Sequence, residues 1–287
     1  MMKKYIVVFA LALLNSQFQA QTVNEPKDHP AKWSQPYEPF RVAGNLYYVG
    51  TYDLASYLIV TKKGNILINT GLADSLPMIK NNIKKLGFNY NDTKILLLTQ
   101  AHYDHLGAMA AIKKETGAKL YVDQEDADVL KSGGKSDYEL GKYGVTFEPV
   151  NPDRVLKDKD FITLGDTKLM MLHHPGHTKG SCSFLFETKD NKRKYKVLIA
   201  NMPTIIIDKK FSEVASYPTI QKDYEYTLEE MKKLDFDIWV ASHASQFDLH
   251  KKHQPKDPYN PEVFMNKKEY LDEIDSLEKD YLKKIAE

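Results

Sequence analysis

The sequence predicts an α/β fold, and three observations support this prediction. Short apolar segments rich in β-branched or aromatic residues alternate along the chain with segments of helical periodicity. No repeat, low-complexity tract or linker divides residues 21–287. The composition, 42% hydrophobic and 28% charged, excludes a disordered or fibrous protein and is sufficient for a large core. We therefore expect residues 21–287 to form a single domain.

The predicted strands are short and bounded by Gly, Asp, Asn or Lys. In chain order they are Leu46–Val49, Ser56–Val60, Asn65–Ile68, Ile95–Thr99, Lys119–Val122, Lys168–Leu172, Ser183–Phe186, Lys196–Ala200 and Ile238–Ala241. The first predicted helix carries apolar residues three or four positions apart and ends at Gly87; its apolar face consists of Leu76, Ile79, Ile83 and Leu86. The remaining predicted helices are Ala108–Thr116, Gln124–Leu130, Ile220–Leu234 and Val263–Ile285.

The N-terminus is typical of a secretory signal peptide. Met1–Lys4 carries positive charge, Tyr5–Leu14 is apolar, and polar residues follow. The apolar run is too short for a membrane span of about 20 residues. We expect cleavage after Ala20, which makes residues 1–20 the signal peptide and places the mature protein in the periplasm.

Charge and cysteine content exclude several classes of function. Forty Lys and Arg residues against 39 Asp and Glu residues give a formal charge of +1, so the chain lacks the strong field that nucleic acid or anionic membrane binding uses. The single cysteine, Cys182, excludes an intramolecular disulfide and a Cys-rich zinc motif, and we expect it to be buried. Nine histidines remain as candidate functional residues.

The most informative segment follows the strand that ends at Thr99. It reads Gln-Ala-His-Tyr-Asp-His-Leu-Gly over residues 100–107 and places four potential metal ligands within six residues: Gln100, His102, Asp104 and His105. Imidazole and carboxylate are common zinc ligands. In an extended turn, the first three would project to one side and His105 to the other, which would serve two adjacent metals. The alternative is that the two histidines only cap a helix starting near Ala108.

Two later histidines also follow predicted strands. His177 lies in a Gly-containing turn after the strand at 168–172, and His243 follows the strand at 238–241. A single histidine at such a place is more often structural, but three occurrences at strand ends favour a shared site.

This pattern resembles the metallo-β-lactamase superfamily, whose signature is His-x-His-x-Asp-His followed by single histidines. It is most similar to the subclass B3 enzymes of the GOB type, in which Gln occupies the first ligand position, as Gln100 does here. The resemblance includes Gly71, Gly134–Tyr138 and His243–Phe247. It implies a four-layer αβ/βα sandwich with the metal site at one edge between the sheets.

The resemblance also implies the ligands and the chemistry. Gln100, His102 and His177 would form a first zinc site, and Asp104, His105 and His243 a second. A zinc-bound water that loses its proton near neutral pH would attack the β-lactam carbonyl of penicillins, cephalosporins or carbapenems. Asp104 would orient this water, which makes it the catalytic residue. The family further implies a monomer with one or two zinc ions and a role in antibiotic resistance.

Two residues depart from the superfamily pattern. The amide oxygen of Gln100 is a weaker ligand than imidazole, and a non-ligand role for Gln100 remains open. Asn69 stands where the superfamily has an Asp behind a metal ligand, and an amide cannot supply that carboxylate. We therefore expect the second site to be the better occupied one, which leaves a mono-zinc enzyme possible.

The remaining residues of interest lie outside the proposed ligand set. Thr204 either donates a hydrogen bond to the substrate carboxylate or is a simple strand-end hydroxyl. Met202 is expected to pack in the core or pocket rather than bind zinc. His174 is expected at the surface, and His29, His250 and His253 in solvent.

Two alternative functions stay open at this level. One is another hydrolase of the same fold, acting on thioesters or lactones; it is disfavoured because Leu198–Met202 lacks the bridging Asp of those enzymes. The other is a non-catalytic zinc-binding protein with a degraded ligand set.

Overall fold

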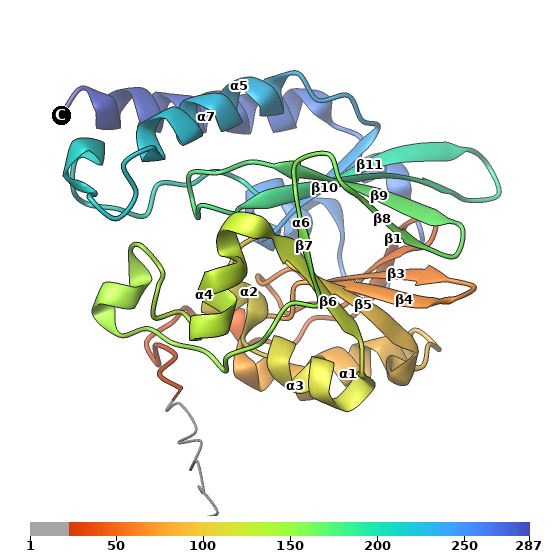
Figure 1. The fold of residues 1–287 in the computed structure, drawn as a ribbon. Coiled ribbons are helices and arrows are strands. Elements are labelled where there is room, and N and C mark those ends of the chain that lie inside the picture. The colour runs from red at the N-terminus through yellow and green to blue at the C-terminus, as the bar shows by residue number, and fades with distance from the viewer. Residues whose placement is uncertain (1–22) are drawn as a thin grey trace, which may run out of the picture.

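The structure is a computed structural model and describes residues 23–287 (Figure 1). Two β-sheets pack face to face and helices cover the outer face of each, so the expected four-layer αβ/βα sandwich is confirmed. The predicted signal peptide and its cleavage after Ala20 lie outside the described residues. Across residues 23–287, no helix combines the length and apolarity needed to cross a membrane.

The first sheet has seven strands in chain order. These are β1 (Phe40–Ala43), β2 (Leu46–Tyr48), β3 (Tyr57–Thr61), β4 (Gly64–Ile68), β5 (Thr93–Leu97), β6 (Lys119–Asp123) and β7 (Arg154–Leu156). Strands β1 to β4 pair antiparallel, whereas β4 to β7 pair parallel.

The second sheet has the order β12-β11-β10-β9-β8. Its strands are β8 (Phe161–Leu164), β9 (Thr167–His173), β10 (Cys182–Lys189), β11 (Lys194–Ala200) and β12 (Ile238–Ala241). Only the β11–β12 pair is parallel. β12 is buried along its whole length, as expected of a strand covered on both faces.

Helices of three turns or fewer lie mainly against the first sheet, and the two longest lie against the second (Figure 1). The first group contains α1 (Leu76–Lys85), α2 (Tyr103–Leu106), α3 (Met109–Thr116) and α4 (Ala127–Ser132). The second contains α5 (Ile220–Lys232) and α7 (Lys267–Ile285), with the short α6 (Leu249–Lys252) between them in sequence.

Side-chain alternation assigns the faces of the first sheet. On β3, Tyr57 and Ile59 belong to the core shared with the second sheet, whereas Leu58 packs with the helices on the outer face. On β5, Leu97 faces the shared core and Leu96 the outer helices. This period of two is the one that a strand requires when both of its faces are buried.

All nine predicted strands and the predicted helical regions are found, with boundaries shifted by a few residues. The sequence prediction missed β1, β7 and β8. β7 and β8 are edge strands with exposed positions, including Val155 at 49% and Phe161 at 45% exposure, so their apolar pattern is weak.

Candidate metal centre

The candidate ligands meet because hydrogen bonds tie the ends of their strands together. The Ser242 hydroxyl, after β12, donates to the Thr99 hydroxyl, after β5, at 2.9 Å. The backbone N–H of Cys182, at the start of β10, donates to the Thr99 carbonyl at 2.8 Å. Strand ends from both sheets therefore converge on Thr99, the residue before Gln100.

The segment after Thr99 changes conformation at His102. His102 has extended backbone angles (φ −109°, ψ 149°), and α2 begins at Tyr103. The expectation that Asp104 projects with Gln100 and His102 is therefore wrong, because the helical turn carries Asp104 and His105 to a second group. The capping alternative is also wrong, since neither α2 nor α3 has a side-chain cap hydrogen bond.

The turn that carries His177 depends on a glycine. Gly176 has φ 132°, and a Cβ atom at this position would lie 2.9 Å from the ring of Tyr224. The Gly176 N–H donates to the Thr178 carbonyl at 2.9 Å, which closes the turn around His177. Only glycine combines this backbone conformation with this close approach.

The first group, which we call the first triad, consists of Gln100, His102 and His177. The amide nitrogen of Gln100 lies 3.0 Å from His177 Nε2 and 3.5 Å from His102 Nδ1, and these two ring nitrogens are 3.2 Å apart. All three side chains are buried. Because the oxygen and nitrogen of a Gln amide are assigned from their surroundings, a half-turn about χ3 places Oε1 in the same position.

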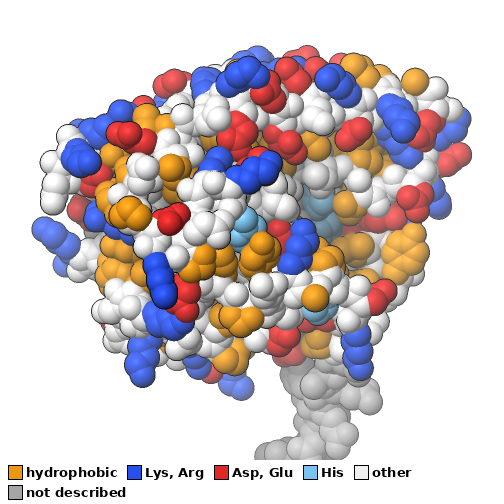
Figure 2. All heavy atoms as spheres, turned by 180° about the vertical axis from the view of Figure 1, so that it is seen from behind, with side chains coloured by type: hydrophobic (Ala, Val, Ile, Leu, Met, Phe, Trp, Pro, Cys, Tyr) orange, Lys and Arg blue, Asp and Glu red, His pale blue; other side chains and the backbone are white. Residues whose placement is uncertain are grey.

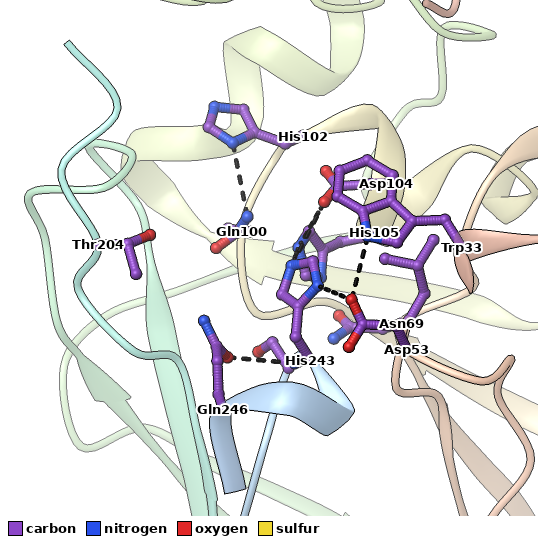
Figure 3. Close-up of polar contacts among 12 residues, drawn as sticks. Trp33, Asp53, Asn69, Gln100, His102, Asp104, His105, Thr204, His243 and Gln246 are labelled. Carbon is purple, nitrogen blue, oxygen red and sulfur yellow. Dashed lines mark hydrogen bonds and ion pairs between the residues drawn. The ribbon is translucent and has the colours of Figure 1, made fainter. Parts of the chain in front are cut away.

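The second triad consists of Asp104, His105 and His243 (Figure 3). Asp104 Oδ2 lies 3.2 Å from His105 Nε2 and 3.4 Å from His243 Nε2, and the two Nε2 atoms are 3.2 Å apart. Asp104 and His105 come from α2, whereas His243 follows β12.

Both triads fit a zinc ion. Tetrahedral ligands at about 2.0–2.1 Å from zinc are separated by about 3.3 Å from each other, and every edge of the two triads lies between 3.0 and 3.5 Å. Each ring nitrogen carries at most one hydrogen, so hydrogen bonds among the members account for at most two edges of such a triangle. A cation at its centre contacts all three atoms.

Each of three histidines uses one ring nitrogen for its triad and the other for an outer partner. His102 Nε2 faces Asp137 Oδ2 at 3.4 Å, and His243 Nδ1 faces Asp53 Oδ2 at 3.7 Å. His177 Nδ1 lies 2.8 Å from the Thr204 carbonyl oxygen. Such partners fix the orientation of a ligating ring and raise its basicity.

The two triads differ in electrostatics. Burial lowers the pKa of His177 to about 3, so its ring is neutral and ready to ligate. Burial raises the pKa of Asp104, but the imidazoles of His105 and His243 outweigh burial and hold that pKa well below its usual value. Burial lowers the pKa of His243, but the nearby carboxylates of Asp104 and Asp53 outweigh burial and raise the pKa to about 9. Burial lowers the pKa of His102 as well, but the Asp137 carboxylate outweighs burial and raises that pKa. The second triad thus contains a carboxylate among its three members, whereas the first contains none.

Sequence reasoning missed the residues that support the triads. Asp53 is 2% exposed; it accepts hydrogen bonds from the Trp33 indole at 3.1 Å and the Ser245 N–H at 3.0 Å, and it pairs with Lys32 at 3.0 Å. The Trp33 ring in turn lies 5.7 Å from the His243 ring. Asp53 and Asp137 resemble ordinary loop acids in the sequence, and only their burial reveals them.

Asn69 and Thr204 were singled out from the sequence, and the structure places both at the site. The Asn69 amide bonds Thr99, accepting from its N–H at 2.9 Å and donating to its hydroxyl at 3.0 Å. It therefore acts on the strand end that carries Gln100 rather than on an imidazole ring. The Thr204 hydroxyl lies 3.0 Å from His177 Nδ1, beside the first triad.

Several weaker predictions were also tested. Met202 and Cys182 are buried at 1% exposure, as expected. His174 is 2% exposed and its Nδ1 lies 2.8 Å from the Ser183 hydroxyl, so the predicted surface position is wrong. The prediction that His253 is solvated is also wrong, because this ring stacks on Phe40 at 3.7 Å and is 8% exposed.

His250, also predicted to be solvated, is only partly exposed. Its ring stacks on Tyr52 at 3.7 Å, and its Nε2 lies 2.7 Å from the Tyr52 carbonyl oxygen. His29 is partly exposed too, and its ring stacks on Trp33 at 6.2 Å.

Comparison with known proteins agrees with this geometry. Residues 50–190 match the family model described as the metallo-beta-lactamase superfamily. The structure is similar to that of the metallo-beta-lactamase GOB-18 from Elizabethkingia meningoseptica, with 71% identity, a TM-score of 0.92, and coverage of 93% of this chain and 99% of that chain.

Two further solved structures are similar along nearly their whole length. The class B3 di-zinc metallo-beta-lactamase LRA-12 from an Alaskan soil metagenome is 67% identical, with a TM-score of 0.90 and coverage of 92% of this chain and 100% of that chain. A beta-lactamase from Chitinophaga pinensis is 54% identical, with a TM-score of 0.89 and coverage of 91% and 100%.

The chain therefore belongs to the metallo-β-lactamase superfamily, and within it to the B3 subclass. The fold and the enzyme class predicted from the residues at 100–107, His177 and His243 are confirmed by these similarities.

Proposed function

We propose that this protein is an exported, zinc-dependent β-lactamase that hydrolyses the amide bond of penicillins, cephalosporins and carbapenems and so confers antibiotic resistance. The observation that carries the proposal is the pair of triads at one edge of the sandwich, each with the spacing of a zinc site. Identity of 54–71% with proteins described as β-lactamases supports the substrate class.

The ligand assignment follows the triads. Gln100, His102 and His177 would hold one zinc ion, and Asp104, His105 and His243 a second. The second triad contains a carboxylate held ionised by its neighbours, whereas the first contains an amide and two imidazoles and no carboxylate. We therefore infer that the second triad binds zinc more tightly and that the enzyme holds one or two ions depending on the zinc available.

Zinc bound here would supply a Lewis acid for the β-lactam carbonyl and would lower the pKa of an attacking water molecule to near neutrality. The chain's own residues orient the reactants. Asp104 is ionised and can only accept hydrogen bonds. It therefore accepts one from the attacking water and orients the lone pair of the water oxygen toward the β-lactam carbonyl.

Thr204 would orient the substrate. The Thr204 carbonyl accepts from His177 Nδ1 at 2.8 Å, and the Thr204 hydroxyl lies 3.0 Å from the same nitrogen. A hydroxyl that accepts from this ring keeps its own hydrogen for another acceptor, and the carboxylate of a β-lactam is an acceptor of the required charge.

Hydrolysis of a penicillin and a carbapenem by the mature protein tests the proposal. We expect turnover of both that is lost with a chelator and restored by added zinc. Protein that holds zinc and shows no turnover would contradict the proposed substrate, and thioesters and lactones would then be the next substrates to test.

Export is a separate part of the proposal. Fractionation of cells that express residues 1–287 should place the protein in the periplasm, with Gln21 as its first residue. Retention in the cytoplasm with an intact N-terminus would contradict it.

The near-neutral charge supports a small-molecule substrate rather than nucleic acid or membrane, and Figure 2 shows acidic and basic side chains interspersed over one face. We further propose a monomer, which sedimentation would test.

A further inference from the structure

A buried carboxylate outside both triads connects the two loops that carry the first triad. Asp126 follows β6 and is 1% exposed. Its Oδ2 accepts from the Ala101 N–H at 2.9 Å, and Ala101 lies between the first-triad residues Gln100 and His102. The same oxygen accepts from the Thr178 hydroxyl at 2.8 Å, and Thr178 follows His177.

The other carboxylate oxygen reaches the same loop. Asp126 Oδ1 accepts from the Gly180 N–H at 2.9 Å. A Cβ atom at Gly180 would lie 2.7 Å from the Asp126 side chain, so this approach requires glycine. Although Asp126 is the residue before α4, its side chain makes no cap hydrogen bond to that helix. Its hydrogen bonds are therefore directed to the ligand loops rather than to its own helix.

The second triad has no equivalent link to Asp126. Asp104 and His105 lie on α2, beyond Ala101, and His243 is held by contacts around Asp53. Burial raises the pKa of Asp126 to about 6, so the carboxylate is ionised at pH 7. An ionised carboxylate with three donors is a rigid anchor, because each bond to a charged acceptor is stronger than a neutral one.

We propose that Asp126 is a positioning residue that fixes the spacing of Gln100, His102 and His177 and thereby sets the zinc affinity of the first triad without affecting the second. The inference rests on the proposed ligand set. Because Gln100 is a weak ligand, the first triad depends more on prearranged geometry than a triad of three imidazoles would.

The test measures zinc affinity at each triad separately. His243→Ala leaves only the first triad complete, and His177→Ala leaves only the second. In each background, zinc dissociation constants are measured by competition with a chromophoric chelator, with and without Asp126→Asn. In Asn an NH₂ group replaces one carboxylate oxygen. This NH₂ group faces a backbone N–H group that donated to the carboxylate, and two donors cannot bond each other, so at least one hydrogen bond is lost.

We expect Asp126→Asn to weaken zinc binding on the order of 10- to 100-fold in the His243→Ala background. In the His177→Ala background it should change binding by no more than about twofold. Co²⁺ absorption in the His243→Ala background should change in parallel, because it reports the ligand geometry. Asp128→Asn is the matched control, because Asp128 is an exposed acid two residues further along the chain, in α4; it should change neither constant.

Equal effects in the two backgrounds, or no effect in either, would overturn the inference. If Asp126→Asn does not fold, Thr178→Val removes one anchor bond at constant shape and should weaken the first triad roughly 2- to 10-fold; absence of that selective loss also overturns it. Failure of both backgrounds to bind zinc would refute the ligand set itself. Zinc binding in both with no β-lactam hydrolysis by the wild type would refute only the proposed substrate.

Discussion

The two triads have nearly the same size and differ in how they are built. Their edges span 3.0–3.5 Å in the first and 3.2–3.4 Å in the second. The first joins two loops through an amide and two imidazoles, and its outer support includes the Asp126 carboxylate, which bonds the backbone of both loops. The second places Asp104 and His105 on one short helix and supports His243 from Asp53.

This difference separates two ways to hold a cation. The second triad contains charge, so electrostatic attraction contributes to binding even where geometry is imperfect. The first triad has no carboxylate and relies more on positioning. Substitutions that alter charge should therefore act mainly on the second triad, and substitutions that alter geometry mainly on the first.

The largest effect is expected from Asp104→Asn. This substitution removes the only carboxylate among the six proposed ligands and the acceptor that orients the attacking water. We expect kcat for β-lactam hydrolysis to fall by about 10²- to 10⁴-fold, measured at saturating zinc. Asp208→Asn removes the same charge at an exposed position; it is the control and should leave kcat unchanged. Retention of kcat within tenfold would show that Asp104 has no catalytic role.

Two carboxylates outside the triads test whether each triad is supported separately. Asp53→Asn weakens the orientation of His243, and Asp137→Asn weakens that of His102. Each should reduce zinc affinity about 10- to 100-fold at its own triad, as resolved in the single-triad backgrounds. If each variant lowers zinc affinity equally at both triads, the two triads are not supported separately.

Replacing the weak ligand Gln100 should make the zinc affinities of the two triads more similar. Gln100→His gives the first triad three imidazoles, and we expect first-triad zinc affinity to rise about tenfold, or 1.4 kcal/mol. The bound zinc per chain after dialysis at limiting zinc should rise accordingly. Gln124→His, at an exposed position, is the control. Unchanged affinity would indicate that Gln100 does not ligate zinc.

The smallest effect on activity is expected at His174, which lies on the first-triad loop but outside the triad. Burial lowers the pKa of His174 from its ordinary value of 6.5 to about 4. The folded-state pKa lies below the unfolded value, so this group stabilises the fold above pH 6.5 and that contribution is lost as the pH falls toward 4.

We expect the metal-free wild type to lose about 3 kcal/mol more unfolding free energy between pH 7 and pH 4 than His174→Gln does. Urea unfolding at both pH values measures this difference. Parallel losses in the two proteins would show that His174 makes no such contribution.

The ligands could be predicted from the sequence because their signal is local. Gln100, His102, Asp104 and His105 lie within six residues, and His177 and His243 each follow a recognisable strand. Edge strands β7 and β8 were missed because they have one exposed face and a weak apolar pattern. The helical turn at Tyr103 was missed because four residues are too few for a periodic signal.

The supporting residues could not be predicted, because their partners are distant in sequence. Asp53 bonds Ser245 across 192 positions, and Asp126 bonds Thr178 across 52. His174 was expected at the surface because it is polar and lies beside a Pro-Gly turn, yet Ser183 supplies a partner that makes its burial possible.

The sequence by itself determined the fold class, the layer order implied by its family and the six candidate ligands, because periodicity and ligand type are properties of short segments. The family resemblance also implied how those ligands divide into two sites. Only the tertiary structure decided which carboxylates support them and where the helical turn of α2 begins. These features depend on hydrogen bonds between strand ends from both sheets, which exist only once the sheets have packed.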